Sequence, residues 1–86
     1  MSRRVLFTYL TGQNNQARER GVELEIIVQE SDEVDAWKVD QFNDNEGEHI
    51  VVLCPVGSGG FYKKLLREWH EKFDPEGRVI EASESE

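Results

Sequence analysis

Residues 22–29 alternate strictly along the chain, and this pattern constrains the fold more than any other feature. Successive side chains of a β-strand point to opposite faces. One face of this segment is therefore apolar, formed by Val22, Leu24, Ile26 and Val28. A strand of this kind needs a sheet that is covered on one side. The chain must accordingly build a second layer over that sheet.

Three further segments have strand character. Residues 4–10 are apolar on both faces, which predicts an interior strand. Only eleven residues separate Leu10 from Val22, too few for a helical crossover, so we expect an antiparallel hairpin of residues 4–10 with residues 22–29. Residues 31–45 fit a helix or a strand, and a third antiparallel strand is favoured. Residues 49–56 are almost continuously apolar and predict a central strand covered on both faces.

Residues 58–73 form the clearest helix of the sequence. Its apolar stripe recurs every four residues and comprises Phe61, Leu65, Trp69 and Phe73, widened by Tyr62 and Leu66. A proline and a glycine in residues 74–77 end it. Residues 78–82 predict a short last strand, and residues 83–86 a frayed acidic tail.

These elements predict one domain over residues 1–86, because two cores would each need roughly 50 residues. The expected class is α+β in two layers. We expect a mostly antiparallel sheet of four or five strands with one long C-terminal amphipathic helix packed on one face.

The formal charge of −8 is concentrated in the middle of the chain. Residues 19–48 contain eleven acidic residues against Arg20 and Lys38. Such a block would repel nucleic acid, which disfavours direct nucleic-acid binding, and it suits a basic surface on a protein. Tryptophan is a frequent interface anchor, and Trp37 lies inside the block. The expected partner-binding residues are Asp32, Glu33, Asp35, Trp37, Asp40 and Asp44.

The leading hypothesis is therefore a small acidic protein-binding module without enzymatic activity. It would act as a regulator or inhibitor that docks on a basic surface of a partner protein, such as a surface that binds nucleic acid. The charge pattern alone supports this interpretation. Self-association through an exposed strand edge, giving a homodimer, stays open beside it.

The alternative hypothesis is a functional site at residues 54–60. The protein would then be a small anion- or nucleotide-binding protein, or a thiol-dependent enzyme. This segment joins a buried strand to a helix N-terminus, where free N–H groups bind anions, and Cys54 would be the thiol. It resembles the loop of cysteine-dependent phosphatases, although Gly60 stands where those enzymes carry an arginine. The candidate anion-binding residues are Gly57, Ser58, Gly59, Gly60, Lys63 and Lys64.

No residue pattern indicates a metal site, a cofactor or a catalytic group with a defined role. The single cysteine excludes an intramolecular disulfide and fits a reducing compartment. The sequence contains neither a signal-peptide core nor an apolar run of about 20 residues. We therefore expect a cytoplasmic protein without a membrane anchor.

Overall fold

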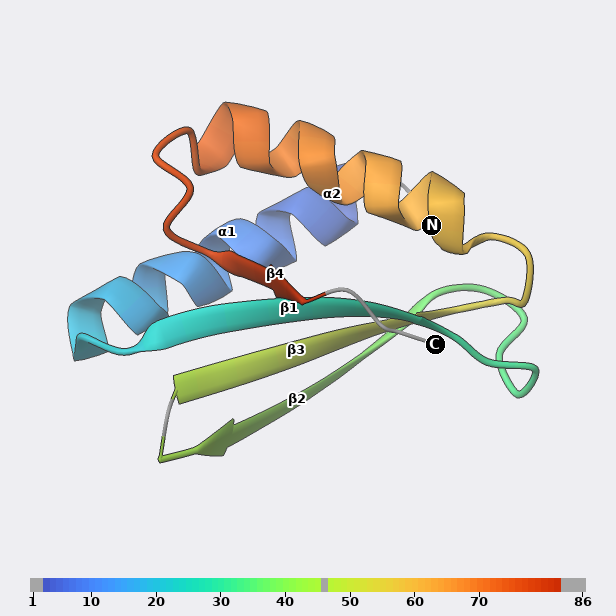
Figure 1. Cartoon of the computed structure of the whole chain (residues 1–86), viewed down its shortest axis with the longest axis horizontal. Coiled ribbons are helices and arrows are strands. Elements are labelled where there is room, and N and C mark those ends of the chain that lie inside the picture. Colours follow the sequence, from blue (N-terminus) through green and yellow to red (C-terminus); the bar gives the residue numbers. More distant parts are fainter. Residues whose placement is uncertain (1–2, 46, 83–86) are drawn as a thin grey trace.

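The computed structural model describes residues 3–45 and 47–82, with the backbone alone for residues 80–82. The predicted acidic tail, residues 83–86, lies outside the described residues. The elements follow the order α1 (Arg3–Arg20), β1 (Glu23–Glu30), β2 (Lys38–Asp44), β3 (Gly47–Cys54), α2 (Gly59–Phe73) and β4 (Ile80–Ala82) (Figure 1).

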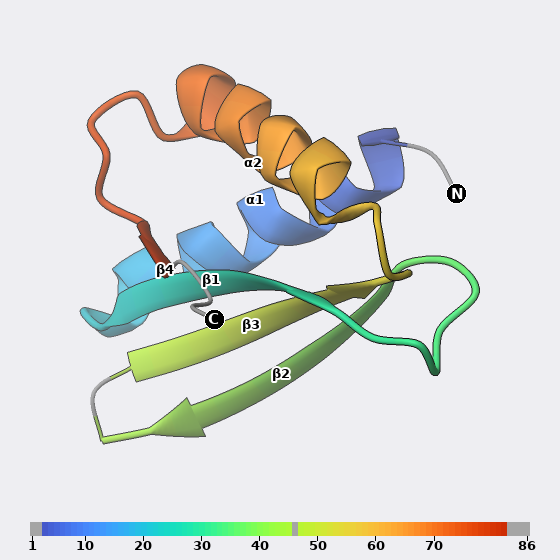
Figure 2. The ribbon, with the colours of Figure 1, turned by 45° about the vertical axis from the view of Figure 1, so that its right-hand side comes forward.

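The four strands form one mixed sheet in the order β2-β3-β1-β4. Strand β1 pairs in parallel with both β3 and β4, whereas β2 runs antiparallel to β3. Both helices lie over the same face of the sheet (Figures 1 and 2). The two-layer α+β class is thus confirmed. The prediction of a mostly antiparallel sheet is wrong, because β3 lies between β1 and β2 and pairs in parallel with β1, as β4 also does.

The largest correction concerns the first segment, which is a helix of 18 residues and not a strand. Leu6, Phe7 and Leu10 are buried on one side of α1, and Asn14 and Ala17 continue this stripe at helical spacing. Packing of the stripe on the sheet outweighs the poor helix propensity of the middle of the segment. The predicted hairpin with residues 22–29 consequently does not exist.

Gly21 ends helix α1 and starts the sheet. It adopts a φ of +73°, which favours glycine. The Gly21 N–H donates to the Arg18 carbonyl at 3.1 Å, and the Val22 N–H donates to the Ala17 carbonyl at 3.0 Å. These two bonds form a Schellman motif that satisfies carbonyl groups at the helix end. The chain then turns directly into β1.

Strand β1 confirms the alternation at residues 22–29, because Leu24, Ile26 and Val28 are buried beneath the helices. The paired residues of β3 on this face, Ile50 and Val52, are buried as well. On the opposite face of β3 the side chains are only half-buried. The prediction of an interior strand at residues 49–56 is thus confirmed for residues 49–54, but the structure covers this strand on one face only.

Helix α2 confirms the predicted C-terminal helix, although its buried face is narrower than the predicted stripe. Leu65, Leu66 and Trp69 are buried, and the Trp69 Nε1–H donates to Thr11 Oγ1 of α1 at 3.1 Å. Phe61 and Phe73 instead remain 60% and 43% exposed. The two helices thus share one core over the sheet, and the two ends of α2 are left partly uncovered.

Asp74 ends helix α2 and positions the last strand. Its side chain is buried and accepts hydrogen bonds from the N–H groups of Arg78 and Val79 at 3.0 and 2.9 Å. The predicted strand at residues 78–82 is present as the shorter β4, and it lies parallel to β1. No helix within the described ranges is long and apolar enough to cross a membrane.

Candidate functional site

The predicted acidic segment folds as a loop followed by an edge strand. Residues 31–37 connect β1 to β2, and Asp32, Glu33 and Asp35 are exposed there. The Ser31 N–H donates to the Cys54 carbonyl at 2.8 Å, and Ser31 Oγ accepts from the Glu33 N–H at 3.1 Å. The base of the loop is therefore tied to the sheet, while its three carboxylates face solvent.

Strand β2 carries the other two predicted carboxylates on the open face of the sheet. Asp40 pairs in register with Val51, and Asp44 with Gly47. The helices cover the opposite face, so neither acid enters the core. In the described part of the sheet β2 pairs with β3 alone, and its outer edge is unpaired. We call the loop 31–37 together with β2 the acidic edge.

A cluster on the open face links three strands through a histidine. The two ring nitrogens of His49 lie 2.9 Å from Asp44 Oδ2 and 2.7 Å from Glu25 Oε1, and the Phe42 ring stacks on the imidazole with centroids 4.8 Å apart. The hydrogen bonds to Asp44 and Glu25 raise the pKa of His49 above 6.5. Asp44 of the acidic edge thus already has a histidine of the same chain as its partner.

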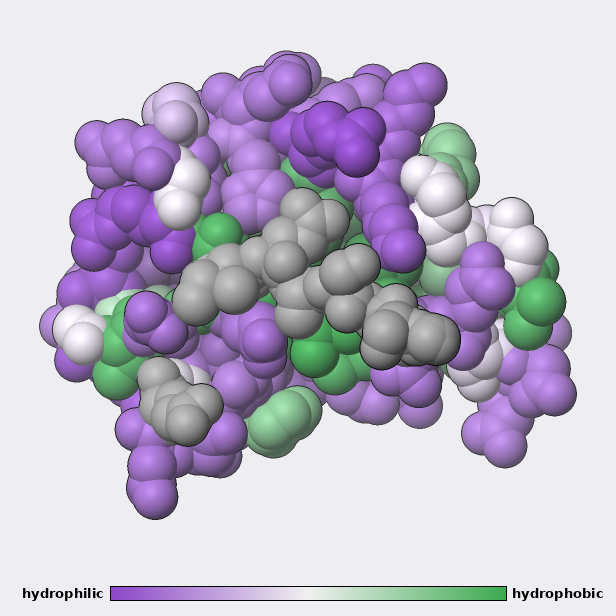
Figure 3. All heavy atoms as spheres, in the orientation of Figure 1, coloured by the Kyte–Doolittle hydropathy of each residue, from purple (hydrophilic) through white to green (hydrophobic). Residues whose placement is uncertain are grey.

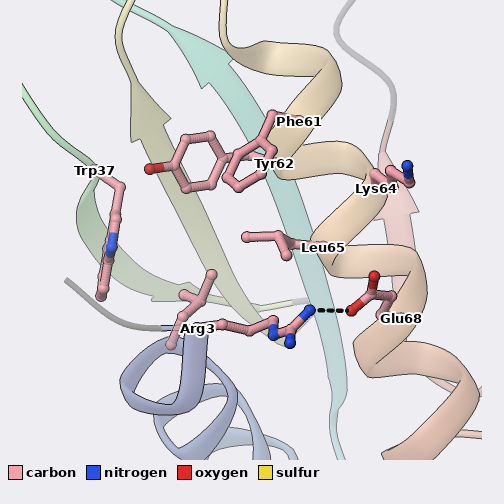
Figure 4. A pocket seen from close by; sticks show the side chains of 8 residues that line it. Arg3, Trp37, Phe61, Tyr62, Lys64, Leu65 and Glu68 are labelled. Atoms are coloured by element: carbon pink, nitrogen blue, oxygen red, sulfur yellow. Dashed lines mark hydrogen bonds and ion pairs between the residues drawn. The ribbon is translucent and has the colours of Figure 1, made fainter.

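Trp37 differs from the fully exposed anchor that its acidic surroundings suggest. Its side chain is half-buried and packs against the core cluster. It forms one wall of a cavity, whose other side comes from Tyr62 and Leu65 of α2 (Figure 4). Burial raises the pKa of the Tyr62 hydroxyl above its ordinary value of 10. The acidic edge thus contains five exposed carboxylates, and of its two aromatic residues Trp37 borders the cavity.

The predicted anion-binding loop has an anion of the chain at its helix N-terminus. Glu30, at the end of β1, places Oε2 2.8 Å from the N–H of Gly59, the first residue of α2. Ser58 does not cap the helix with its side chain, because its Oγ donates to the Pro55 carbonyl at 2.6 Å. An external phosphate at this N–H would have to displace the Glu30 carboxylate.

The other residues of this loop are dispersed. Cys54 is fully buried, and its Sγ contacts the Gln29 carbonyl at 3.7 Å, so the thiol is a core group. Gly57 and Gly60 are exposed. Lys63 lines a small cavity with Glu30, whereas Lys64 is exposed and borders the cavity beside Trp37. The anion-binding hypothesis stays a prediction. In the structure the Glu30 carboxylate would compete with an external anion for the N–H of Gly59.

The sequence analysis missed three polar residues that the fold brings to special positions. Glu30 caps α2, and Glu25 binds His49 across the sheet. Glu48 is 1% exposed and forms an ion pair with Arg20 at the end of α1. The one available signal was the position of Glu48 and His49 directly before the apolar run of residues 50–54, because polar residues that enter a buried strand need partners.

Comparison with protein-family models, with characterised proteins and with solved structures gave no match. Among the described residues, no group of three His, Cys, Asp or Glu side chains is arranged to hold a metal ion. The geometry of the acidic edge is therefore the basis for the functional proposal.

Proposed function

We propose that the protein is a small acidic, non-enzymatic protein-binding module that docks on a basic surface of a partner through its acidic edge. The supporting observation is the placement of Asp32, Glu33, Asp35, Asp40 and Asp44 along one loop and one edge strand. Residues 31–45 contain five acidic residues and only Lys38 as a base, a formal charge of −4. Complementary fields of this kind accelerate association and select a partner of opposite charge.

The position of β2 adds a second reason. An edge strand offers unpaired backbone groups to another chain, and its carboxylates restrict which chain can approach. An acidic edge of this kind would cover a partner surface that otherwise binds nucleic acid, because the edge and a nucleic acid both present several negative charges to a basic surface. The module would then regulate or inhibit that partner by occupying its basic surface.

The test compares two variants of equal net charge. In the first, Asp32, Asp35 and Asp40 become asparagine and Glu33 becomes glutamine. In the control, four exposed acids away from the acidic edge become glutamine, namely Glu19, Glu23, Glu71 and Glu76. Each protein is used to capture partners from the lysate of its source cell at low salt and at about 0.5 M salt, where the Debye length falls to about 4 Å.

A partner held at low salt by the wild type and the control, and lost from the first variant, would support the acidic edge as the docking surface. Loss from both variants would show that net charge alone drives the interaction, and it would contradict a defined surface. Retention by all three proteins would exclude these carboxylates from the interface.

A further inference from the structure

A cavity of about 410 Å³ lies beside the acidic loop, between the start of α1, the first turns of α2 and residue 37 (Figure 4). This volume is within the range of about 300 to 1,000 Å³ that is typical of ligand sites. Three aromatic residues, Trp37, Phe61 and Tyr62, line it, with Leu65 between them. It is therefore an aromatic hollow on the surface of a strongly acidic chain.

The aromatic rings of this cavity leave apolar surface uncovered. Phe61 is 60% exposed, and Trp37 and Tyr62 are half-buried. In the close view the Trp37 ring and the Tyr62 ring flank an open space, with Leu65 on the side of the helix (Figure 4). An aromatic side chain inserted there could stack on Trp37 and displace water from three rings, a geometry that stabilises aromatic pairs.

The carboxylates of the loop beside the cavity favour a ligand that has basic groups on this side. Asp32, Glu33 and Asp35 precede Trp37 in the same loop, and they are exposed. On the side of the helices, Arg3 pairs with Glu68, whose Oε1 lies 2.9 Å from the guanidinium, and the exposed Lys64 of α2 adds a positive charge to the lining. Basic groups of a ligand would therefore face the loop and not the helices. Figure 3 shows apolar and hydrophilic side chains next to one another at the end of the molecule where the β1–β2 and β3–α2 loops lie.

We infer that this cavity receives an aromatic side chain of the partner, from a segment in which lysine or arginine flanks that aromatic residue. The inference rests on the proposed function, because the flanking cations would contact the acidic loop. The aromatic residue would be the buried anchor. The basic residues would orient the segment on the acidic loop and increase its association rate. The recognised element is thus a short basic segment of a protein with one aromatic residue at its centre.

The test uses two blocked synthetic peptides, Lys-Lys-Trp-Lys-Lys and Lys-Lys-Ala-Lys-Lys, titrated into ¹⁵N-labelled protein. The chain has two tryptophans, so the indole N–H signals report separately on the cavity and on the core. Trp69 is fully buried and hydrogen-bonded to Thr11, and it serves as the internal reference. We expect the tryptophan peptide to shift the Trp37 signal, to leave Trp69 unchanged and to bind at least about fivefold more tightly than the alanine peptide.

Two phenylalanine variants then locate the anchor. Phe61→Ala removes an exposed ring of the cavity, and Phe73→Ala removes an exposed ring at the other end of the same helix. We expect F61A to reduce the affinity for the tryptophan peptide to that for the alanine peptide, and F73A to leave the ratio unchanged. Neutralising the three loop acids should weaken both peptides by a similar factor.

Three outcomes would overturn the inference. Equal affinity of the two peptides would exclude an aromatic anchor while leaving acidic docking intact. Binding of neither peptide at low salt would contradict the proposed function as well. A Trp37 signal that shifts with protein concentration in the absence of peptide would show that a second copy of the chain fills the cavity.

Discussion

At the scale of single residues, Gly47 allows β1 and β3 to approach closely because glycine has no Cβ atom. It starts β3 with a φ of +148° and pairs with Glu23 of the parallel strand β1. A Cβ atom at this position would collide with the Glu23 carbonyl oxygen. Both the φ value and the contact exclude other residues, because neither the backbone of β1 nor that of β3 can retreat without breaking the ladder.

Gly47→Ala should therefore lower the free energy of unfolding by about 2 kcal/mol or more. Gly60→Ala is the matched control, because a Cβ there meets no atom within 4 Å, in the first turn of α2. The control should gain about 0.5 to 1 kcal/mol through improved helix propensity. Urea unfolding of both variants measures the two effects, and an unchanged G47A midpoint would contradict the close approach.

His49 makes stability depend on pH. Its folded-state pKa is raised, first by Asp44 and then by Glu25, above the ordinary value of 6.5. A raised pKa means that the folded state binds the proton more tightly than the unfolded state. The stabilisation is complete below pH 6.5, and it is lost as pH rises through the folded-state pKa.

We thus expect the free energy of unfolding to decrease from pH 6 to pH 8.5, and His49→Gln to remove most of this decrease. An NMR titration of the imidazole signals measures the pKa directly. Asp44→Asn should move it back toward 6.5, because the largest contribution is removed. A His49 pKa at or below 6.5 in the wild type would show that the two carboxylates do not hold the proton.

At the scale of elements, the junction of α2 and β4 depends on one carboxylate. Asp74 Oδ1 accepts from the Arg78 N–H, and Oδ2 accepts from the Val79 N–H and lies 3.1 Å from His70 Nδ1. These bonds satisfy donors next to the buried Val79, and β4 begins at the following residue. Their loss would leave the buried Val79 N–H and the part-buried Arg78 N–H without these acceptors, which is costly.

Asp74→Ala should lower the free energy of unfolding by about 2 to 4 kcal/mol. Asp74→Asn should lie between this variant and the wild type, because one of the two oxygen acceptors remains. Glu71→Ala, an exposed acid one turn earlier in α2, should change stability by less than about 0.5 kcal/mol. Thermal unfolding of the three variants checks this order, and equal losses in the alanine variants would refute a special role for Asp74.

The outcome for the helices shows what local sequence can predict. The stripe at residues 58–73 indicates a helix on its own, because four apolar residues recur at one spacing. In α1, Gly12, Asn14 and Asn15 oppose a helix locally, and only burial of the flanking apolar residues against the sheet decides the state. The parallel pairing of β1 with β3 likewise depends on contacts between residues far apart in the sequence. The number of residues in a connecting loop does not predict it.

The candidate site shows the same limit. Exposure of Asp32, Glu33 and Asp35 was predictable, because a run of acids does not enter a core. The cap of α2 by Glu30 was not predictable, because 29 positions separate Glu30 from Gly59 and only the topology of the sheet brings them together. The wall that Trp37 contributes to a cavity also required the placement of α1 and α2.

At the scale of the whole molecule, we expect the repulsion among carboxylates to outweigh the attraction within the exposed ion pairs. The chain has 18 acidic and 10 basic residues besides its two histidines. Arg3–Glu68 is largely exposed, with side chains 58% and 37% accessible, and such pairs contribute little. The Arg20–Glu48 pair is shielded on the Glu48 side and is less sensitive to salt. Screening should therefore relieve more repulsion than the attraction it weakens.

Raising sodium chloride from about 0.02 to 0.3 M, which shortens the Debye length from roughly 20 to 6 Å, should raise the Tm by about 2 to 4 °C. A variant with Asp32→Asn, Glu33→Gln and Asp35→Asn should have a higher Tm at low salt and a smaller response. Potassium chloride gives the same expectation, because the effect depends on ionic strength. Calorimetry at fixed pH measures it. A Tm that falls with salt would mean that attraction within the ion pairs outweighs the repulsion among the carboxylates.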